Sequence, residues 1–250
     1  MQFVEYTVDA SVAVVRLDRP PVNALSAALA SELLEAFDRA SDPSIRALVV
    51  TGSPHFAAGA DIKEFRAAFG TSGVASELAD AVLALERLAK PTIAAVRGFA
   101  LGGGLELAMG ADFRYLATDA KVGQPEILLG IIPGAGGTQR LTRLVGYRAA
   151  RDLIFTGRHV PAQEALELGI ADKVVDDVLD AAMEDAHGWA SGPTVAYGAA
   201  KASLRVGLDE GLDVERGEFV RTFDSEDARE GVQAFIEKRR ASFTGGSADA

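Results

Sequence analysis

Short apolar runs that alternate with segments of helical spacing constrain the fold of this chain more than any other feature of its sequence. Residues 47–50, 92–96 and 111–117 each have the length and apolar content of a buried strand. Residues 76–88 and 105–109, which lie between these runs, have helical spacing. Strands that alternate with helices at this interval indicate an α/β core.

The two ends of the chain predict different structures. At the start, alternation over residues 3–8 and 12–17 predicts a β-hairpin, and Ser26 predicts the N-cap of a helix. The last third is expected to be helical, because the apolar spacing becomes helical from Gly137 onward. The later helices are expected at residues 179–189, 194–206, 214–223 and 228–241.

The composition limits the classes of function. The chain has 250 residues, no cysteine and a formal net charge of −11. The absence of cysteine excludes a disulfide framework, a thiolate nucleophile and a thiolate metal site. The acidic balance disfavours nucleic acid as a partner. A small phosphorylated ligand stays compatible with it, because a few local basic residues can hold one.

No targeting or membrane-spanning segment is expected. The first five residues lack the basic flank and apolar stretch of a signal peptide. The most apolar region, residues 92–113, is interrupted by Arg97, Glu106 and Asp112, and such charges are costly in a membrane span. We therefore expect no membrane association and a cytoplasmic protein.

A loop of small residues precedes an expected helix start near Asp61. Ala58, Gly59 and Ala60 belong to this loop, and small residues let a backbone approach a ligand closely. The amide of Ala60, beside the start of a helix, can point at an anion. Taken alone, the segment is more simply an ordinary loop and helix cap.

Three glycines, Gly102, Gly103 and Gly104, stand between an expected strand and an expected helix. They match neither the G-x-G-x-x-G fingerprint of a dinucleotide site nor the P-loop pattern. The amide of Gly103 can instead donate to a developing oxyanion. Glu106 projects from nearly the same helix face, and a carboxylate in an apolar run is costly unless it is used or paired. A glutamate that the helix dipole favours in a first turn explains Glu106 equally well.

Glu126 is a second carboxylate among apolar residues, and a glycine-rich turn follows it. Burial raises the pKa of such a group toward the range useful for proton transfer at neutral pH. A helix-start glutamate after Pro125 explains the residue equally well.

The histidines indicate no metal or hydrolase site. His55, His159 and His187 are scattered, none has a metal-type neighbour four residues on, and no G-x-S-x-G motif is present. We interpret them as structural or surface residues.

Together, these motifs resemble the enoyl-CoA hydratase/isomerase (crotonase) family over essentially the whole chain. Weaker matches lie near both ends, at Arg19-Pro20, Val22-Asn23-Ala24-Leu25, Glu230-Gly231 and Phe235-Ile236-Glu237-Lys238-Arg239. The strong matches are Phe56-Ala57-Ala58-Gly59-Ala60-Asp61-Ile62-Lys63-Glu64, Ala100-Leu101-Gly102-Gly103-Gly104-Leu105-Glu106-Leu107-Ala108, Gly123-Gln124-Pro125-Glu126-Ile127-Leu128-Leu129-Gly130 and Pro133-Gly134-Ala135-Gly136-Gly137-Thr138-Gln139-Arg140-Leu141.

The resemblance implies a fold and an assembly. The expected fold is the α/β crotonase (ClpP-like) spiral of ββα units with a C-terminal helical trimerisation region. Residues 1–190 are expected to form the core with the site. Residues 191–250 are expected to form the helical region for oligomerisation and CoA contact. Family trimers commonly pair into hexamers, so the expected partners are an acyl-CoA and further copies of the chain.

The resemblance also implies a site. The amides of Ala60 and Gly103 are expected to bind the thioester carbonyl oxygen, and Glu106 and Glu126 match the two catalytic glutamates of the hydratases. Gly134 matches a position whose amide helps to orient the water. The other implied substrate- and CoA-binding residues are Ala58, Asp61, Ile62, Lys63 and Pro133, together with Phe219 and Lys238 from a neighbouring subunit.

The implied reaction is that of an enoyl-CoA hydratase, a hydro-lyase of fatty acid β-oxidation. Water adds across the 2,3 double bond of a trans-2-enoyl-CoA to give the (3S)-3-hydroxyacyl-CoA. The two amides bind the carbonyl oxygen more tightly as charge builds on it. We assign Glu106 chiefly to the water and Glu126 chiefly to the proton at C2. The reaction requires no metal or redox cofactor, because coenzyme A is part of the substrate.

Three alternatives stand beside this interpretation. A Δ3-Δ2-enoyl-CoA isomerase is the nearest, but isomerases of the family usually work with one glutamate, so Glu106 and Glu126 together favour hydration. A hydratase of a specialised acyl-CoA stays open, because residues 61–75, expected to border the acyl tail, do not reveal its length. A non-catalytic RNA-binding or scaffold protein is disfavoured by both carboxylates and by the acidic charge.

Overall fold

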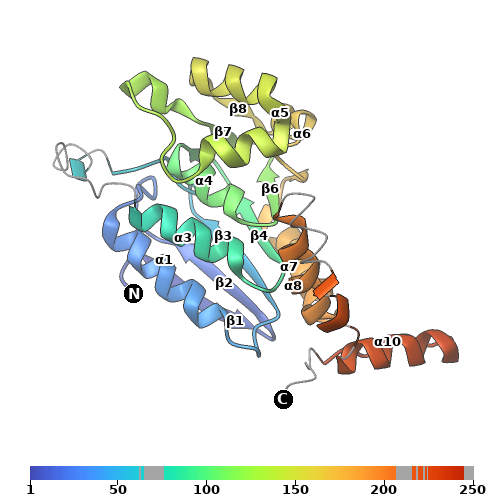
Figure 1. Ribbon diagram of the computed structural model, residues 1–250. Coiled ribbons are helices and arrows are strands. Elements are labelled where there is room, and N and C mark those ends of the chain that lie inside the picture. Colours follow the sequence, from blue (N-terminus) through green and yellow to red (C-terminus); the bar gives the residue numbers. More distant parts are fainter. Residues whose placement is uncertain are drawn as a thin grey trace.

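The structure, a computed structural model, describes residues 1–61, 63–64, 76–206, 216–217, 219–221, 223 and 225–244. Its centre is a sheet of six strands in the order β1-β2-β3-β4-β6-β9 (Figure 1). The β1–β2 pair is antiparallel and every other pair in this sheet is parallel. A second sheet has the order β5-β7-β8. The predicted α/β core is confirmed.

The elements follow one another in a fixed order along the chain. The strands are β1 Val4–Asp9, β2 Val12–Leu17, β3 Ala47–Gly52, β4 Thr92–Val96, β5 Phe99–Leu101, β6 Phe113–Ala117, β7 Lys121–Gly123, β8 Val160–Pro161 and β9 Lys173–Val175. The helices are α1 Ala27–Ala40, α3 Ser76–Arg87, α4 Gly103–Gly110, the 3-10 helix η1 Pro125–Leu129, α5 Gly137–Thr156, α6 Ala162–Leu168, α7 Val178–Ala190, α8 Thr194–Leu204 and α10 Glu226–Glu237.

The predicted strands form the middle of the large sheet. Every residue of β3 and β4 is buried, as expected of parallel strands that are covered on both faces. Helix α7 packs on β3 and β4, while α1 packs on β1 and β2. Helices α1 and α3 lie side by side, which closes one flank of the core (Figure 1). This packing holds the ends of the parallel strands rigid where the loops leave them.

The start of α1 agrees with the sequence prediction. The Ser26 hydroxyl accepts a hydrogen bond from the amide of Leu29 at 3.1 Å, so Ser26 is the N-cap. Leu29, Leu33 and Phe37 are buried on the inner face of this helix. A polar cap and an apolar stripe of helical period therefore suffice to start and orient α1.

Four short strands differ from the prediction. No strand is predicted from the sequence at the positions of β5, β7, β8 and β9, and each of these strands has only two or three residues. The small sheet matters for the site, because β5 leads directly into the glycines before α4 and β7 leads directly into η1. Pairing of Leu101 with Gly123 across this sheet brings the two helix starts together.

The C-terminal part is helical, as predicted. Helix α8 is joined to the sheet region by an ion pair between Lys201 and Asp112, with 2.8 Å between Nζ and Oδ2. Helix α10 projects away from the sheet (Figure 1). The helix expected over 214–223 is only partly within the described residues, and those described between 216 and 223 are helical. Among the helices that the structure describes, none has the length and apolarity to span a membrane.

Candidate active site

A cavity of about 890 Å³ opens at the start of α4. Its walls come from the loop after β3, the glycines before α4, η1 and the turn that follows η1. Apolar side chains make up much of the surface, and Glu106 and Glu126 are two of the five acidic residues that line it, the others being Asp61, Glu64 and Glu77. The apolar lining residues include Leu25, Ala30, Leu78, Leu101, Leu129, Ile131 and Ile132.

Backbone pairing sets the loop after β3 against the glycine run. The loop runs parallel to β5, since the amide of Ala57 donates to the Phe99 carbonyl at 2.9 Å and the amide of Leu101 donates to the Ala57 carbonyl at 3.0 Å. A Cβ placed on Gly104 would lie 2.1 Å from the Ala57 carbonyl oxygen. Only glycine therefore lets the start of α4 approach the loop so closely.

Two backbone amides at this cavity lack a protein acceptor. The residues flanking Ala60 pair with Leu25, because the Leu25 amide donates to the Gly59 carbonyl at 2.8 Å and the Asp61 amide donates to the Leu25 carbonyl at 2.9 Å. In a parallel bridge this turns the N–H of Ala60 itself away from Leu25. Gly103 is the first residue of α4, whose amide has no partner inside the helix. Within the described part of the chain, neither amide donates to another protein atom, and both residues line the cavity.

Glu106 lies in the first turn of α4, a helix that is buried along its whole length, and the residue itself is 2% exposed. Its Oε1 accepts hydrogen bonds from the amides of Ala135 and Gly137, each at 2.7 Å. Burial raises the pKa of Glu106, while these two bonds and the charge of Arg140 oppose the rise. The carboxylate is thus buried but held in one orientation by fixed donors.

Glu126 is held at the start of η1, where the preceding Gln124 is fully buried. With its amide nitrogen turned toward Glu126, Gln124 donates to Oε1 at 2.9 Å and to Oε2 at 3.0 Å. Burial, together with a smaller effect of the nearby Glu106, raises the pKa of Glu126 to about 7. A carboxyl of this pKa can carry a proton at neutral pH and release it during a reaction.

The glycine run lies between the two carboxyl groups. A Cβ on Gly102 would lie 3.0 Å from Oε1 of Glu126, and a Cβ on Gly103 would lie 4.0 Å from Oε2 of Glu106. Gly102 has φ +52, in the region that favours glycine. Neighbouring acids with different surroundings can divide protonated and ionised roles between them. Two amide donors and two carboxyl groups therefore border a single space.

The predicted site residues fall into three groups. Ala58, Asp61 and Gly134 line the cavity together with both glutamates, Ala60 and Gly103. Lys63 is exposed, Pro133 is buried, and neither lines the cavity. Phe219 and Lys238 are exposed in the C-terminal part and do not line it either. Ile62 and the predicted acyl-tail border at residues 65–75 lie outside the described residues.

Three polar residues at the site had no role in the sequence prediction. Gln124 and Arg140 support the two glutamates, and Arg19 pairs with Asp61, with 2.6 Å between Nη2 and Oδ2. The bond to Arg19 lowers the pKa of Asp61, so this carboxylate is ionised and already paired. Only the position of Gln124 two residues before Glu126 is a signal in the sequence. The carboxylate partners of these arginines, Glu86 for Arg140 and Asp61 for Arg19, are distant along the chain and appear only in the fold.

No cluster of metal ligands accompanies these groups. In the ranges that the structure describes, no three His, Asp or Glu side chains are gathered as a metal site. The donors that face the cavity are backbone amides, which suit an oxygen atom that gains negative charge.

Comparison with known proteins identifies relatives along nearly the full chain. The family model described as enoyl-CoA hydratase/isomerase matches residues 7–246. A probable enoyl-CoA hydratase of Rhizobium meliloti is 48% identical over 246 residues, which cover 93% of this chain and 94% of that protein. The mitochondrial enoyl-CoA hydratase of Pongo abelii is 41% identical over 244 residues, covering 93% and 83%.

Solved structures agree with these relatives. The enoyl-CoA hydratase of Bacillus anthracis superimposes with a TM-score of 0.90 at 37% identity, over 98% of this chain and all of that one. An enoyl-CoA hydratase structure from Geobacillus kaustophilus has a TM-score of 0.92 at 31% identity, over 97% of each chain. The predicted crotonase fold is confirmed.

Proposed function

The chain belongs to the enoyl-CoA hydratase/isomerase family, and from this we propose that it adds water across the 2,3 double bond of a trans-2-enoyl-CoA. The product is the (3S)-3-hydroxyacyl-CoA of fatty acid β-oxidation. One observation carries the choice of hydration: two carboxyl groups, Glu106 and Glu126, flank one glycine run beside two amides without acceptors. Hydration requires a proton to leave water and another to reach carbon, and two carboxyls supply both steps.

In the proposed mechanism, the thioester carbonyl oxygen accepts hydrogen bonds from the amides of Ala60 and Gly103. As the water oxygen bonds to C3, the π electrons of the double bond move toward the thioester carbonyl oxygen, and an enolate forms. The amides bind the enolate more tightly than the ground state, and in other enzymes the loss of one such donor costs about 10²–10³ in rate. The start of α4 adds its helix dipole at the same point.

The two glutamates take different roles in this proposal. Glu106 accepts a proton from the water, since its carboxylate is oriented by the amides of Ala135 and Gly137. Glu126 delivers a proton to C2, because a pKa of about 7 leaves it substantially protonated at neutral pH. Gly134, in the turn beside Glu106, helps to orient the water.

Binding of the CoA part completes the proposal. Ala58 and Asp61 contact the substrate at the cavity, and the family resemblance assigns substrate contacts to Ile62, Lys63 and Pro133 as well, with no cofactor beyond the CoA of the substrate. Phe219 and Lys238 contact the CoA bound to a neighbouring subunit of a trimer, or of a hexamer formed by two trimers. A cytoplasmic location is part of the same proposal.

The test is hydration of crotonyl-CoA, followed as loss of the enoyl-thioester absorbance. Glu106→Gln and Glu126→Gln are each expected to lower kcat by about 10² or more while KM changes little, because the lost groups act on protons in the transition state. Full activity in either variant contradicts the two-carboxylate mechanism. A wild-type protein that shifts a 3-enoyl-CoA to the 2-enoyl-CoA faster than it hydrates crotonyl-CoA is instead an isomerase.

A further inference from the structure

The Arg140 guanidinium packs against the turn of residues 135–137, whose amides bind Glu106. Arg140 lies in the first turns of α5, and the side chain is 17% exposed. Its Nη1 donates to the carbonyl oxygen of Ala135 at 2.9 Å. Ala135 is the same residue whose amide donates to Glu106, so one peptide segment is held from both sides.

Gly136 makes this arrangement possible. A Cβ on Gly136 would lie 2.0 Å from Nη1 of Arg140, and its φ of +96 favours glycine as well. The guanidinium therefore occupies the space that a side chain at residue 136 would fill. Bonds at Ala135 and Gly137 on one side and the guanidinium on the other leave the turn little freedom.

The other end of the guanidinium is anchored to α3. Its Nη2 pairs with Oε2 of Glu86, whose side chain is 27% exposed. Arg205, at the end of α8, donates through Nη1 to the Glu86 carbonyl oxygen at 2.9 Å. A planar guanidinium can bond a carbonyl and a carboxylate at once in fixed directions, which an ammonium group cannot reproduce.

We propose that Arg140 is a positioning residue for Glu106, which fixes the turn whose two amides orient the carboxylate. Arg140 acts on Glu106 through this turn, and the proposal gives it no contact with the substrate. The proposal rests on the proposed hydratase function, since it assigns a supporting role in that reaction. The charge of Arg140 also favours the ionised form of Glu106 that accepts a proton. The other charged group beside Glu106 is Glu126 of η1, while Glu86 neutralises Arg140 from α3.

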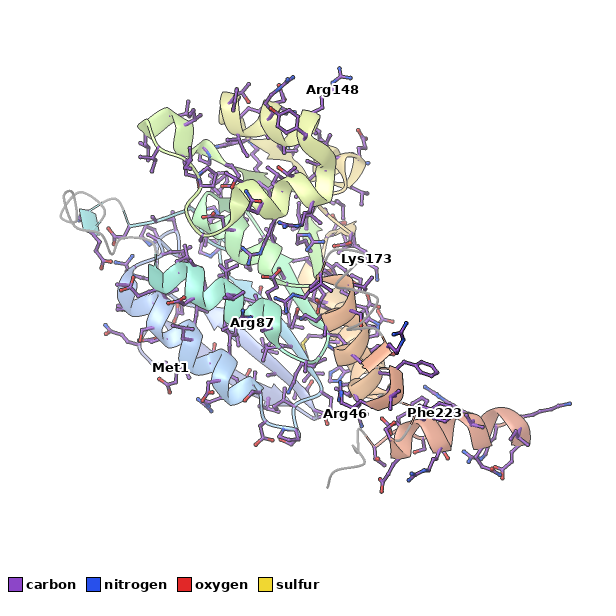
Figure 2. The ribbon with its side chains drawn as sticks, in the orientation of Figure 1. Met1, Arg46, Arg87, Arg148, Lys173 and Phe223 are labelled. Atoms are coloured by element: carbon purple, nitrogen blue, oxygen red, sulfur yellow. The ribbon has the colours of Figure 1, made fainter. Side chains whose placement is uncertain are left out.

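The test compares Arg140→Ala, Arg140→Lys and Arg140→Met with the control Arg148→Ala. Arg148 lies on the same helix, is exposed and points away from the body of the molecule (Figure 2). With crotonyl-CoA, kcat of the Ala and Met variants is expected to fall about 10- to 100-fold with KM within about threefold, as for a small displacement of a catalytic group. The acid limb of their pH profile is expected to move to higher pH, because the cation no longer favours ionised Glu106.

Two further readouts separate positioning from a general structural effect. Arg140→Lys keeps the charge, so its acid limb is expected to stay at the wild-type pH while kcat still falls about tenfold. Millimolar guanidinium is expected to restore part of kcat to Arg140→Ala and none to Arg148→Ala. If Arg140→Ala and Arg140→Met do not fold, Arg140→Lys carries the test alone, with folding checked by thermal melting.

Each outcome decides one of the two proposals. Wild-type kcat and an unmoved pH profile in Arg140→Ala, or wild-type kcat in a folded Arg140→Lys, overturn the role of Arg140 and leave the hydratase function standing. In Arg140→Ala, a loss of kcat without a shifted acid limb and without rescue by guanidinium also overturns it. A wild-type protein without hydration of any enoyl-CoA overturns the proposed function itself, whatever the variants do.

Discussion

Gly104 lets the start of α4 approach the loop after β3 at Ala57, and its replacement tests that close approach. In Gly104→Ala the new Cβ has to displace the Ala57 carbonyl, from which it would lie 2.1 Å away. We expect a loss of about 1–3 kcal/mol of unfolding free energy, as for other overpacked positions, and a fall in kcat. The measurements are chemical denaturation and hydration of crotonyl-CoA.

The control for this variant is Gly188→Ala. Gly188 is exposed in α7, and a Cβ placed there meets nothing within 4 Å. Since alanine favours helix over glycine, this change is expected to stabilise the protein by about 0.5–1 kcal/mol. If Gly104→Ala is as stable and as active as Gly188→Ala, neither stability nor activity depends on the close approach of α4 to the loop.

The raised pKa of Glu126 predicts a pH-dependent effect on stability. Its pKa is about 7 in the folded protein against 4.5 for the ordinary carboxyl group, so folding favours the protonated form. This stabilising contribution is complete below about pH 4.5 and is lost as the pH rises through about 7. Glu126→Gln stays neutral, so it is expected to melt at the wild-type temperature in acid and above it at pH 8.

Thermal melting between pH 4 and pH 9 measures this difference, with a gain of about 1–3 kcal/mol expected on the alkaline side. Glu184→Gln, an exposed glutamate on α7, reports what the same substitution does at the surface. A stability difference between wild type and Glu126→Gln that is constant over the whole pH range contradicts the raised pKa.

At the scale of residues, the sequence predicts the groups whose motifs are local. Gly103 and Glu106 are three residues apart on one helix, so their common face follows from helical geometry. The amide partners of Glu106 come from Ala135 and Gly137, and the carbonyl partner of Arg140 belongs to the same turn. The two contacts of Glu106 depend on how the turn before α5 packs against α4, which no spacing along the chain reveals.

At the scale of elements, one ion pair connects α8 to the sheet. Lys201 bonds to Asp112, which also accepts bonds from the amide and the hydroxyl of Thr92, both at 2.9 Å. The lysine side chain is 11% exposed, and burial lowers its pKa. Lys201→Met leaves a largely buried carboxylate without its cation, at an expected cost of about 2–4 kcal/mol in the free energy of unfolding.

Urea denaturation measures this cost, and Lys121→Met, at an exposed lysine of β7, is the matched control. We expect the control to change stability by less than about 0.5 kcal/mol, as surface substitutions usually do. Equal midpoints for the two variants argue against the ion pair as the attachment of α8.

Long elements of the fold are predicted from the sequence, whereas very short strands and a kink within a helix are not. Strands β3 and β4 are predicted because each contains a continuous apolar run of four residues, 47–50 and 93–96, that is buried on both faces. Strands β7 and β8 have three and two residues, too few for any period to be seen. Helix α5 is predicted, but its kink at Gly146, where φ is +75, is not, because glycine also occurs inside straight helices.

At the scale of the whole molecule, the C-terminal part exposes many large apolar side chains. Leu204 is 84% and Phe223 64% exposed, and Phe223 lies beside the start of α10 (Figure 2). The other exposed apolar side chains of this part include Phe219, Val220, Val232 and Ile236. Apolar surface of this kind on a monomer marks a site of association.

We therefore expect trimers or hexamers of the 26.1-kDa chain, measured by light scattering after size exclusion. Val220→Glu combined with Phe223→Glu is expected to give smaller species, because burying two charges in an apolar interface is costly. Arg148→Glu, which changes an exposed residue of α5, serves as the control. A monomeric wild-type protein contradicts the proposed assembly.

The donors at residues 60 and 103 are main-chain groups, fixed by the pairing of the loop after β3 with β5. Side chains at Ala58, Ala60 and Leu101 can therefore mutate without removing a donor, provided that the backbone keeps its path. Reactivity and substrate selection are thus encoded in separable parts of one site. Substitutions of the side chains that line the cavity can therefore change which acyl group is accepted during evolution. In the proposed mechanism, the two amides that stabilise the enolate are kept through such changes.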